Sequence, residues 1–211
     1  TGDALRHVIG IVAPRHVIAA GPALTEAMAR VIAGVGSIVQ PWTDVDVGGH
    51  WQRIDWAVAS ESIAPPETAT HRTPTLEDLA LYIYTSGTTG LPKAGRVSHH
   101  RVMQWSHWFA GLMEITPADR MYNCLPMYHS IGGVVATCAP LVNGGSVSIA
   151  EKFSASRFWD DIVDGGCTLF QYIGELCRYL SASPVHPKER RHRLRLACGN
   201  GLSAQVWQSF Q

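Results

Sequence analysis

Apolar positions follow two different spacings along the chain, one typical of strands and one typical of helices. Leu79–Thr85 is a nearly continuous apolar run, which is the pattern of a strand buried on both faces. Residues 101–113 instead place Trp105, Phe109 and Leu112 on one stripe of a helix. Because the two patterns alternate along the chain, we expect an α/β fold in which a layered, mostly parallel sheet is flanked by helices.

The spacing of apolar residues also predicts strands and helices in the rest of the chain. Short apolar runs predict strands at residues 16–20, 121–125, 145–150, 167–173 and 193–198, and one that ends at residue 99. Helical spacing predicts helices at residues 3–13, 23–34, 130–142, 154–163 and 175–181, and from residue 203 onward. Thr116–Asp119 has the hydroxyl, the proline and the acid of a helix start. Residues 40–73 are rich in Pro and Gly and predict a loop, with a short helical piece near residues 55–58.

Charge and composition exclude several classes of protein. Among the 211 residues, 17 Lys and Arg balance 17 Asp and Glu, so no overall basic surface for nucleic acid is expected. A hydrophobic content of 46% excludes a disordered chain. The longest weakly polar stretch, residues 131–142, is shorter than the ~20 residues of a membrane-spanning helix. The chain opens without a signal-peptide pattern, and we therefore expect a cytoplasmic protein.

The cysteines point to the same compartment. Their number, 5, is odd, and no two have the C-x-x-C spacing. Most lie inside apolar runs, so we expect reduced thiols in the core of a cytosolic protein. The spacing of zinc ligands is absent from the sequence, and no zinc site is predicted.

The strongest chemical signal is the string Tyr-Thr-Ser-Gly-Thr-Thr-Gly-Leu-Pro-Lys at residues 84–93. Its two glycines let backbone N–H groups approach an anion, and its hydroxyls and Lys93 add further donors. This composition suits a polyphosphate, although an ordinary turn of Gly and Thr is an equally good interpretation of the composition alone. The spacing is neither that of a Walker loop nor that of a G-x-G-x-x-G dinucleotide loop.

The whole string resembles the phosphate-binding signature of the adenylate-forming superfamily, which includes acyl-CoA synthetases, firefly-type luciferases and peptide-synthetase adenylation domains. Leu125–His129 is similar to the second core motif of that superfamily, and Leu196–Leu202 to the strand and turn that meet the adenine. Lys93-Ala94, Glu151–Asp161 and Gln171–Leu180 look most like the very-long-chain acyl-CoA synthetase / fatty-acid transport protein branch.

This resemblance implies an enzyme that uses ATP and Mg²⁺ to convert a fatty acid to acyl-adenylate, and then coenzyme A to form acyl-CoA. The phosphates of ATP would be bound by Thr85, Ser86, Gly87, Thr88, Thr89, Gly90 and Lys93. Of these, Thr85 would also contact Mg²⁺, and Thr85 and Lys93 would act in catalysis together with His129. Contact with a membrane surface is compatible with the family.

Two further segments would complete the site by resemblance. Tyr172, Ile173 and Gly174 would line the fatty-acyl site together with His129, and the glycine would leave room for a chain. Gly199, Asn200 and Gly201 would lie against the adenine. The simpler alternatives are a core histidine at position 129 and two ordinary strand-to-helix turns.

The resemblance also sets expectations for domains and for competing functions. Residues 75–211 match the ATP- and acyl-binding core closely, residues 1–74 match only loosely, and the small C-terminal domain of the family is expected to be absent. Two alternatives stay open. The enzyme could activate another carboxylate, such as a carnitine-like, bile or aromatic acid, or the chain could be an inactive nucleotide- or lipid-binding fragment.

Overall fold

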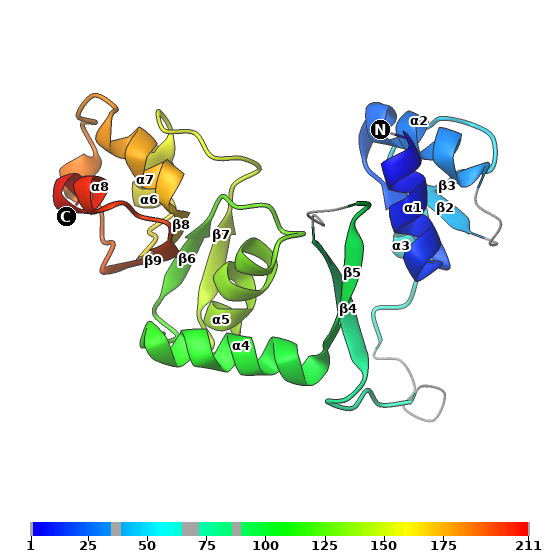
Figure 1. Ribbon diagram of the computed structural model, residues 1–211, viewed down its shortest axis with the longest axis horizontal. Helices are drawn as coiled ribbons and strands as arrows, with labels where there is room; N and C mark the ends of the chain where they lie inside the picture. The colour runs from blue at the N-terminus through cyan, green and yellow to red at the C-terminus, as the bar shows by residue number, and fades with distance from the viewer. Residues whose placement is uncertain (1, 35–38, 65–71, 86–89, 211) are drawn as a thin grey trace. The chain divides into compact units, whose positions relative to one another are not determined.

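The computed structural model describes residues 2–34, 39–64, 72–85 and 90–210 (Figure 1). The chain forms two compact units. The first consists of Thr1–Thr75 and Tyr84–Arg96, and the second of Leu76–Ile83 and Val97–Gln211.

The first unit is built around a parallel sheet with the strand order β1-β2-β3. Its elements are α1 (Gly2–Val12), β1 (His16–Ala19), α2 (Gly21–Ile32), β2 (Gln40–Thr43), β3 (Gln52–Arg53) and α3 (Ile54–Ser60). A buried hydroxyl pair, Thr25 and Thr43 at 2.9 Å, joins α2 to the central strand. Asp44 accepts a hydrogen bond from the backbone N–H of Gly21, at 2.6 Å, and so fixes the start of α2.

The prediction that residues 40–73 form a loop is wrong over β2 and β3. Each of these strands is at most four residues long, and β2 contains Pro41. A run this short shows no strand periodicity of its own, and Pro is usually found at sheet edges. Pairing with β1 on one side and β3 on the other makes the segment a strand. The helical piece predicted near residues 55–58 is present as α3.

The second unit contains a four-stranded sheet in the order β7-β6-β8-β9, and all of its strand pairs are parallel. The strands are β6 (Arg120–Asn123), β7 (Ser146–Ile149), β8 (Leu169–Ile173) and β9 (Leu196–Asn200). The helices are α4 (His99–Leu112), the π-helix η1 (Ile131–Val135), α5 (Ala136–Val142), α6 (Phe158–Asp164), α7 (Gly174–Ser181), the 3₁₀ helix η2 (Glu189–Arg191) and α8 (Ala204–Phe210).

Side chains of this sheet alternate between two cores. Met121 and Leu169 pack on α4 and α5, whereas Tyr122 and Phe170 pack on α6 and α7. This alternation is the period-two geometry of strands, and here both faces are covered by helices (Figure 1). The predicted α/β fold with a mostly parallel sheet flanked by helices is therefore confirmed.

The strand predicted at Leu79–Thr85 is present as β4, but it is not buried on both faces. Its two end residues are exposed and the residues between them are half-buried. β4 pairs with β5 (Lys93–Ser98) in a two-stranded sheet, so it does not lie in the interior of a larger one.

Thr116–Asp119 was expected to start a helix and instead forms a turn before β6. The carboxylate of Asp119 accepts hydrogen bonds from the backbone N–H and the hydroxyl of Thr116, at 2.9 and 3.1 Å. It also accepts one from the hydroxyl of Thr168 and two from the guanidinium of Arg195, at 2.7 to 2.8 Å. The residue types of a helix cap are thus used here to tie β6, β8 and β9 together.

Candidate functional site

The two ends of the predicted phosphate loop lie at the ends of β4 and β5. Thr85 is the last residue of β4 and Lys93 the first residue of β5, and both are exposed, as is Gly90. Ser86, Gly87, Thr88 and Thr89 lie outside the described residues. A hydroxyl and an ammonium group that face solvent at the ends of two paired strands are suited to binding an anion.

Helix α1 holds both ends of this loop, which sequence reasoning did not predict. The hydroxyl of Tyr84 donates to the carbonyl of Val8 at 2.7 Å. The ring nitrogen of His7 lies 3.0 Å from the carbonyl of Pro92. Little in the sequence signalled this contact, since His7 follows another polar residue, Arg6, in the predicted helix.

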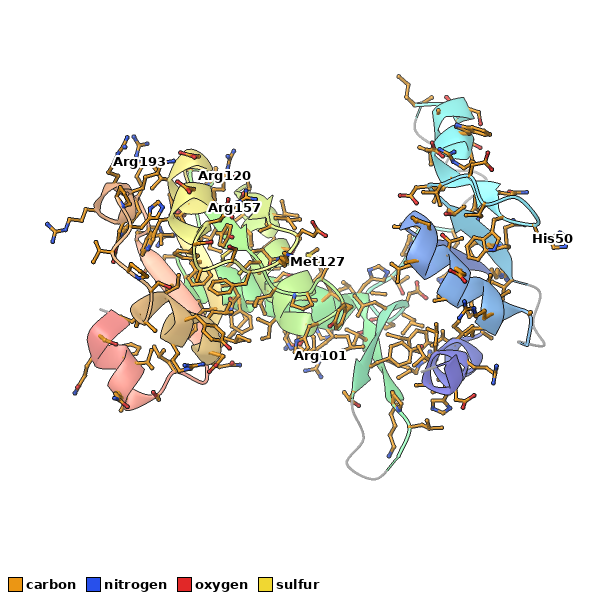
Figure 2. All side chains as sticks on the ribbon, turned by 90° about the horizontal axis from the view of Figure 1, so that it is seen from above. His50, Arg101, Arg120, Met127, Arg157 and Arg193 are labelled. Carbon is orange, nitrogen blue, oxygen red and sulfur yellow. The ribbon has the colours of Figure 1, made fainter. Side chains whose placement is uncertain are left out.

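His129 lies in an exposed loop between β6 and η1, so it is not a core histidine. Its backbone N–H donates to the carbonyl of Pro126 at 3.1 Å, and its carbonyl accepts from the N–H of Gly133 at 2.7 Å. Met127 belongs to the same loop (Figure 2). The backbone around the imidazole is therefore fixed while the ring faces solvent.

Two glycines of η1 bring this loop close to the helix. A Cβ atom on Gly132 would stand 2.4 Å from the carbonyl oxygen of Pro126, and one on Gly133 would stand 2.3 Å from that of Met127. Such approaches are closer than real Cβ contacts, so the loop that carries His129 can pack on η1 in this way only where η1 lacks side chains.

Asn123, at the end of β6, stabilises the same loop through hydrogen bonds. The sequence analysis did not single it out. Its buried amide donates to the carbonyl of Gly132 at 2.9 Å and to the hydroxyl of Thr137 at 3.2 Å. Its oxygen accepts from the N–H of Leu125 at 3.0 Å. The hydroxyl of Thr137 also donates to the carbonyl of Gly132, at 2.8 Å. A single Asn inside an apolar strand was the available signal.

A small, mainly apolar cavity of about 290 Å³ adjoins His129. Its walls come from β4, α4, the His129 loop and η1. The lining residues are Leu81, Tyr82, Ile83, Val102, Met127, Tyr128, His129, Ser130, Gly133, Val134 and Cys138. Burial raises the pKa of the Cys138 thiol, so this group stays protonated at neutral pH and is a poor nucleophile. The cavity thus offers apolar walls and one exposed imidazole.

The predicted acyl and adenine segments lie side by side at the ends of β8 and β9. Tyr172 pairs with Gly199, and Ile173 with Asn200. The acyl segment and the adenine turn, which the sequence predicted separately, are therefore adjacent. Gly199, Asn200 and Gly201 are exposed, and Gly201 has a φ of +72°, the left-handed conformation that glycine adopts most easily.

The side chains of the acyl segment face in different directions. Tyr172 points into the core formed with α6 and α7, where burial raises the pKa of its phenol. It also lines a larger cavity of about 620 Å³ on that face. Asn123 reaches η1 and α5 on the opposite face, so Tyr172 points away from the His129 loop.

By strand alternation, Gln171 and Ile173 point toward the η1 face of the sheet. Ile173 is 41% exposed, whereas Gln171 is only 2% exposed and was not singled out from the sequence. The Gln171 side-chain oxygen has no hydrogen-bond partner within the part of the chain that the structure describes. A buried acceptor without a partner is unusual in native proteins.

The predicted residues divide between the two units. Thr85, Gly90 and Lys93 belong to the first unit, and His129, Tyr172–Gly174 and Gly199–Gly201 belong to the second. Within residues 2–34, 39–64, 72–85 and 90–210, no group of three His, Cys, Asp or Glu side chains could hold a metal ion. Over the same residues, no helix is both long and apolar enough to cross a membrane.

Comparison with known proteins supplies the family. A sequence model described as "AMP-binding enzyme" matches residues 1–211. Human long-chain fatty acid transport protein 1 is 50% identical over 135 residues, which are 64% of this chain and 21% of that protein. The medium/long-chain-fatty-acid–CoA ligase FadD6 of Mycobacterium tuberculosis is 43% identical over 135 residues, 64% of this chain and 23% of that protein.

The fold agrees with that of a solved structure that contains ATP. The ATP-bound crystal structure of MatB from Rhodopseudomonas palustris has a TM-score of 0.80 and 27% sequence identity, and covers 100% of this chain and 40% of the MatB chain. The chain thus spans well under half of the length of these relatives. Since the family model matches throughout, the chain belongs to the AMP-binding enzyme family.

Proposed function

We propose that the protein is a fatty acid–CoA ligase that acts on long- or very-long-chain fatty acids. The fatty carboxylate attacks the α-phosphate of ATP, which forms acyl-adenylate and releases pyrophosphate. The sulfur of coenzyme A then attacks the acyl carbon and AMP leaves. The observation that carries the proposal is the string at residues 84–93, with the exposed Thr85 and Lys93 at the ends of two paired strands.

The relatives support the same substrates. Two of them are named for long-chain fatty acids and for fatty acid–CoA ligation, and the solved MatB structure holds ATP. The "transport protein" name of the human relative also favours work at a membrane surface, and we infer a cytoplasmic protein with peripheral membrane contact. We further infer that residues 75–211 form the ATP- and acyl-binding core and that residues 1–74 flank it.

For the phosphates, we propose that residues 85–90 contribute backbone N–H groups and hydroxyls and that Lys93 contributes its charge. Positioning and charge stabilisation of this kind supply most of the catalysis in phosphoryl chemistry. The Thr85 hydroxyl fits Mg²⁺, which binds oxygen ligands and needs few protein groups when phosphates hold it as well. Mg²⁺ would neutralise phosphate charge there.

For the acyl group, we propose that His129 lies beside the adenylate, where the apolar cavity of about 290 Å³ meets solvent. Ile173, which is exposed on the η1 face, is the member of the acyl segment best placed to meet a chain. Tyr172 would contribute through its backbone, because its ring is buried under α6 and α7. Gly199–Gly201 would lie against the adenine plane.

The test is pyrophosphate release by the protein at its full natural length, with a panel of acids. We expect release that depends on long-chain fatty acids. We expect Lys93→Ala to reduce it by roughly 100- to 1,000-fold, which is the usual loss when one group that stabilises the transition state is removed. Lys152→Ala is the matched control, because Lys152 is an exposed lysine outside the proposed site.

The panel also separates the alternatives. Preference for a carnitine-like, bile or aromatic acid would assign the ligase to another carboxylate, and acyl transfer to a carrier protein would change the acceptor. ATP binding without pyrophosphate release for any acid would favour a binding module. Full activity in the Lys93→Ala variant would refute the proposed phosphate site.

A further inference from the structure

The start of α7 and the turn after β9 are in direct backbone contact. A Cβ atom on Gly174 would stand 1.8 Å from the carbonyl oxygen of Gly201, 2.3 Å from its carbonyl carbon and 2.8 Å from the nitrogen of Leu202. Gly174 does not have a positive φ, so its backbone conformation suits other residues as well. Gly174 is therefore required by the closeness of the other backbone, and the space beside it is filled by protein.

A second close contact between a glycine and a backbone group lies two residues earlier along both segments. A Cβ atom on Gly199 would stand 2.3 Å from the carbonyl oxygen of Tyr172 and 2.5 Å from a carbon of the Tyr172 ring. The ladder of β8 and β9 continues to the pair Ile173 and Asn200. Residues 172–174 and 199–201 thus form one layer of backbone against backbone.

The core behind the turn limits how this layer can adjust. Leu176 of α7 is buried in the same apolar cluster against which Leu202 and Val206 pack. The N–H of Trp207 donates to the carbonyl of Ser203 at 2.9 Å, which holds the start of α8. Since packed interiors yield little, a side chain at position 174 would push Gly201 outward, toward the exposed side of residues 199–201.

We propose that Gly174 is a positioning residue for the nucleotide: by lying against the carbonyl of Gly201, it sets the place of the turn that meets the adenine. This inference rests on the proposed function. It assigns Gly174 to the nucleotide half of the site, in contrast to the sequence-based expectation that this glycine leaves room for the acyl chain.

The deciding experiment is Gly174→Ala in the protein at its full natural length. We expect the KM for ATP and the Kd of ATP to rise about tenfold, as displacements of about 1 Å at a site have effects of this order or larger. The KM for the fatty acid should stay within roughly twofold, since neither Gly174 nor Gly201 lines the proposed acyl cavity beside His129.

Two other glycines provide the controls. Gly111→Ala in α4 adds a Cβ that meets nothing within 4 Å. Its KM and Kd for ATP and its KM for the fatty acid should match those of the wild type. Gly133→Ala adds a Cβ 2.3 Å from the carbonyl of Met127, a clash of similar severity on the His129 loop. It should lower kcat or raise the KM for the fatty acid while it leaves the Kd of ATP near the wild-type value.

If Gly174→Ala does not fold, as judged by circular dichroism and thermal unfolding, Gly201→Ala decides. Its Cβ would meet only the nitrogen of Gly174, at 3.8 Å, so the change acts through the positive φ of the turn. A selective rise in the KM for ATP supports the proposal. An unchanged KM for ATP, or a rise for the fatty acid alone, overturns it. Failure of the wild type to bind ATP would refute the proposed function instead.

Discussion

Two amide side chains on neighbouring strands of the second unit differ in how their hydrogen bonds are satisfied. Asn123 donates to Gly132 and Thr137 and accepts from Leu125, so both ends of its amide are paired. The oxygen of Gln171 has no partner in the described part of the chain, although it is buried. Burial alone therefore does not tell what each amide contributes to stability.

For Asn123, we expect replacement by Leu to be costly, because the N–H of Leu125 loses its buried partner, whereas the carbonyl of Gly132 keeps the hydroxyl of Thr137. The free energy of unfolding should fall by roughly 2 kcal/mol, the scale of one buried group left without a partner. Urea unfolding followed by circular dichroism gives this value. Asn143→Leu is the control, since the amide of the exposed Asn143 donates to the carbonyl of Ile115 at 3.0 Å, and its replacement should cost about 1 kcal/mol.

For Gln171, we do not expect replacement by an apolar side chain to lower the free energy of unfolding. Gln171→Met keeps the length of the side chain and removes an acceptor that has no partner among the residues the structure describes, so the free energy of unfolding should stay within about 0.5 kcal/mol or rise. The same urea titration measures it. A fall of more than roughly 1.5 kcal/mol would show that the amide has a partner in the folded protein, such as an ordered water.

Among the helices and strands, those predicted well from the sequence have long patterns of their own. β4, α4 and β8 each show several apolar positions in phase, and all three were predicted within a few residues. β2 and β3 have two to four residues each and owe their form to pairing, which a local pattern does not contain. The π-helical first turn of the helix predicted at residues 130–142 was missed for the same reason, since it depends on contacts with the His129 loop.

One ion pair joins elements that are far apart in the sequence. The guanidinium of Arg195, before β9, and the hydroxyls of Thr168 and Thr116 hold the pKa of the Asp119 carboxyl well below its usual range, despite burial. Because this pKa is lower in the folded chain than in the unfolded chain, the interaction stabilises the fold fully above about pH 4. That stability is lost as the pH falls toward the folded-state pKa.

Asp119→Asn should therefore destabilise the protein by about 2 kcal/mol at pH 7, the scale of hydrogen bonds to a charged group. The difference from the wild type should shrink as the pH drops below about 4. Thermal unfolding between pH 7 and pH 3 measures both effects. Asp164→Asn, whose carboxylate pairs with Lys188 but is 65% exposed, should leave the unfolding midpoint unchanged. An equal loss at every pH would contradict the assigned role of Asp119.

For the whole chain, the α/β class and the order of motifs followed from the sequence, and the family match agrees with them. The direction in which each site residue points did not. Strand alternation turns Tyr172 into the core, and which face of a strand meets the site depends on the sheet around it. The contact between Gly174 and Gly201 likewise joins residues that are distant in sequence and carry no side chains.

In the proposed reaction, a fatty carboxylate attacks the α-phosphate of ATP. It is tested by mass spectrometry of a reaction that contains the full-length protein, ATP, Mg²⁺ and a long-chain fatty acid, but no coenzyme A. We expect acyl-adenylate in an amount close to that of the enzyme, with pyrophosphate alongside it, and we expect Lys93→Ala to form both products roughly 100- to 1,000-fold more slowly. Folded wild-type protein that leaves the fatty acid unmodified, or that releases inorganic phosphate without acyl-adenylate, would contradict the proposed reaction.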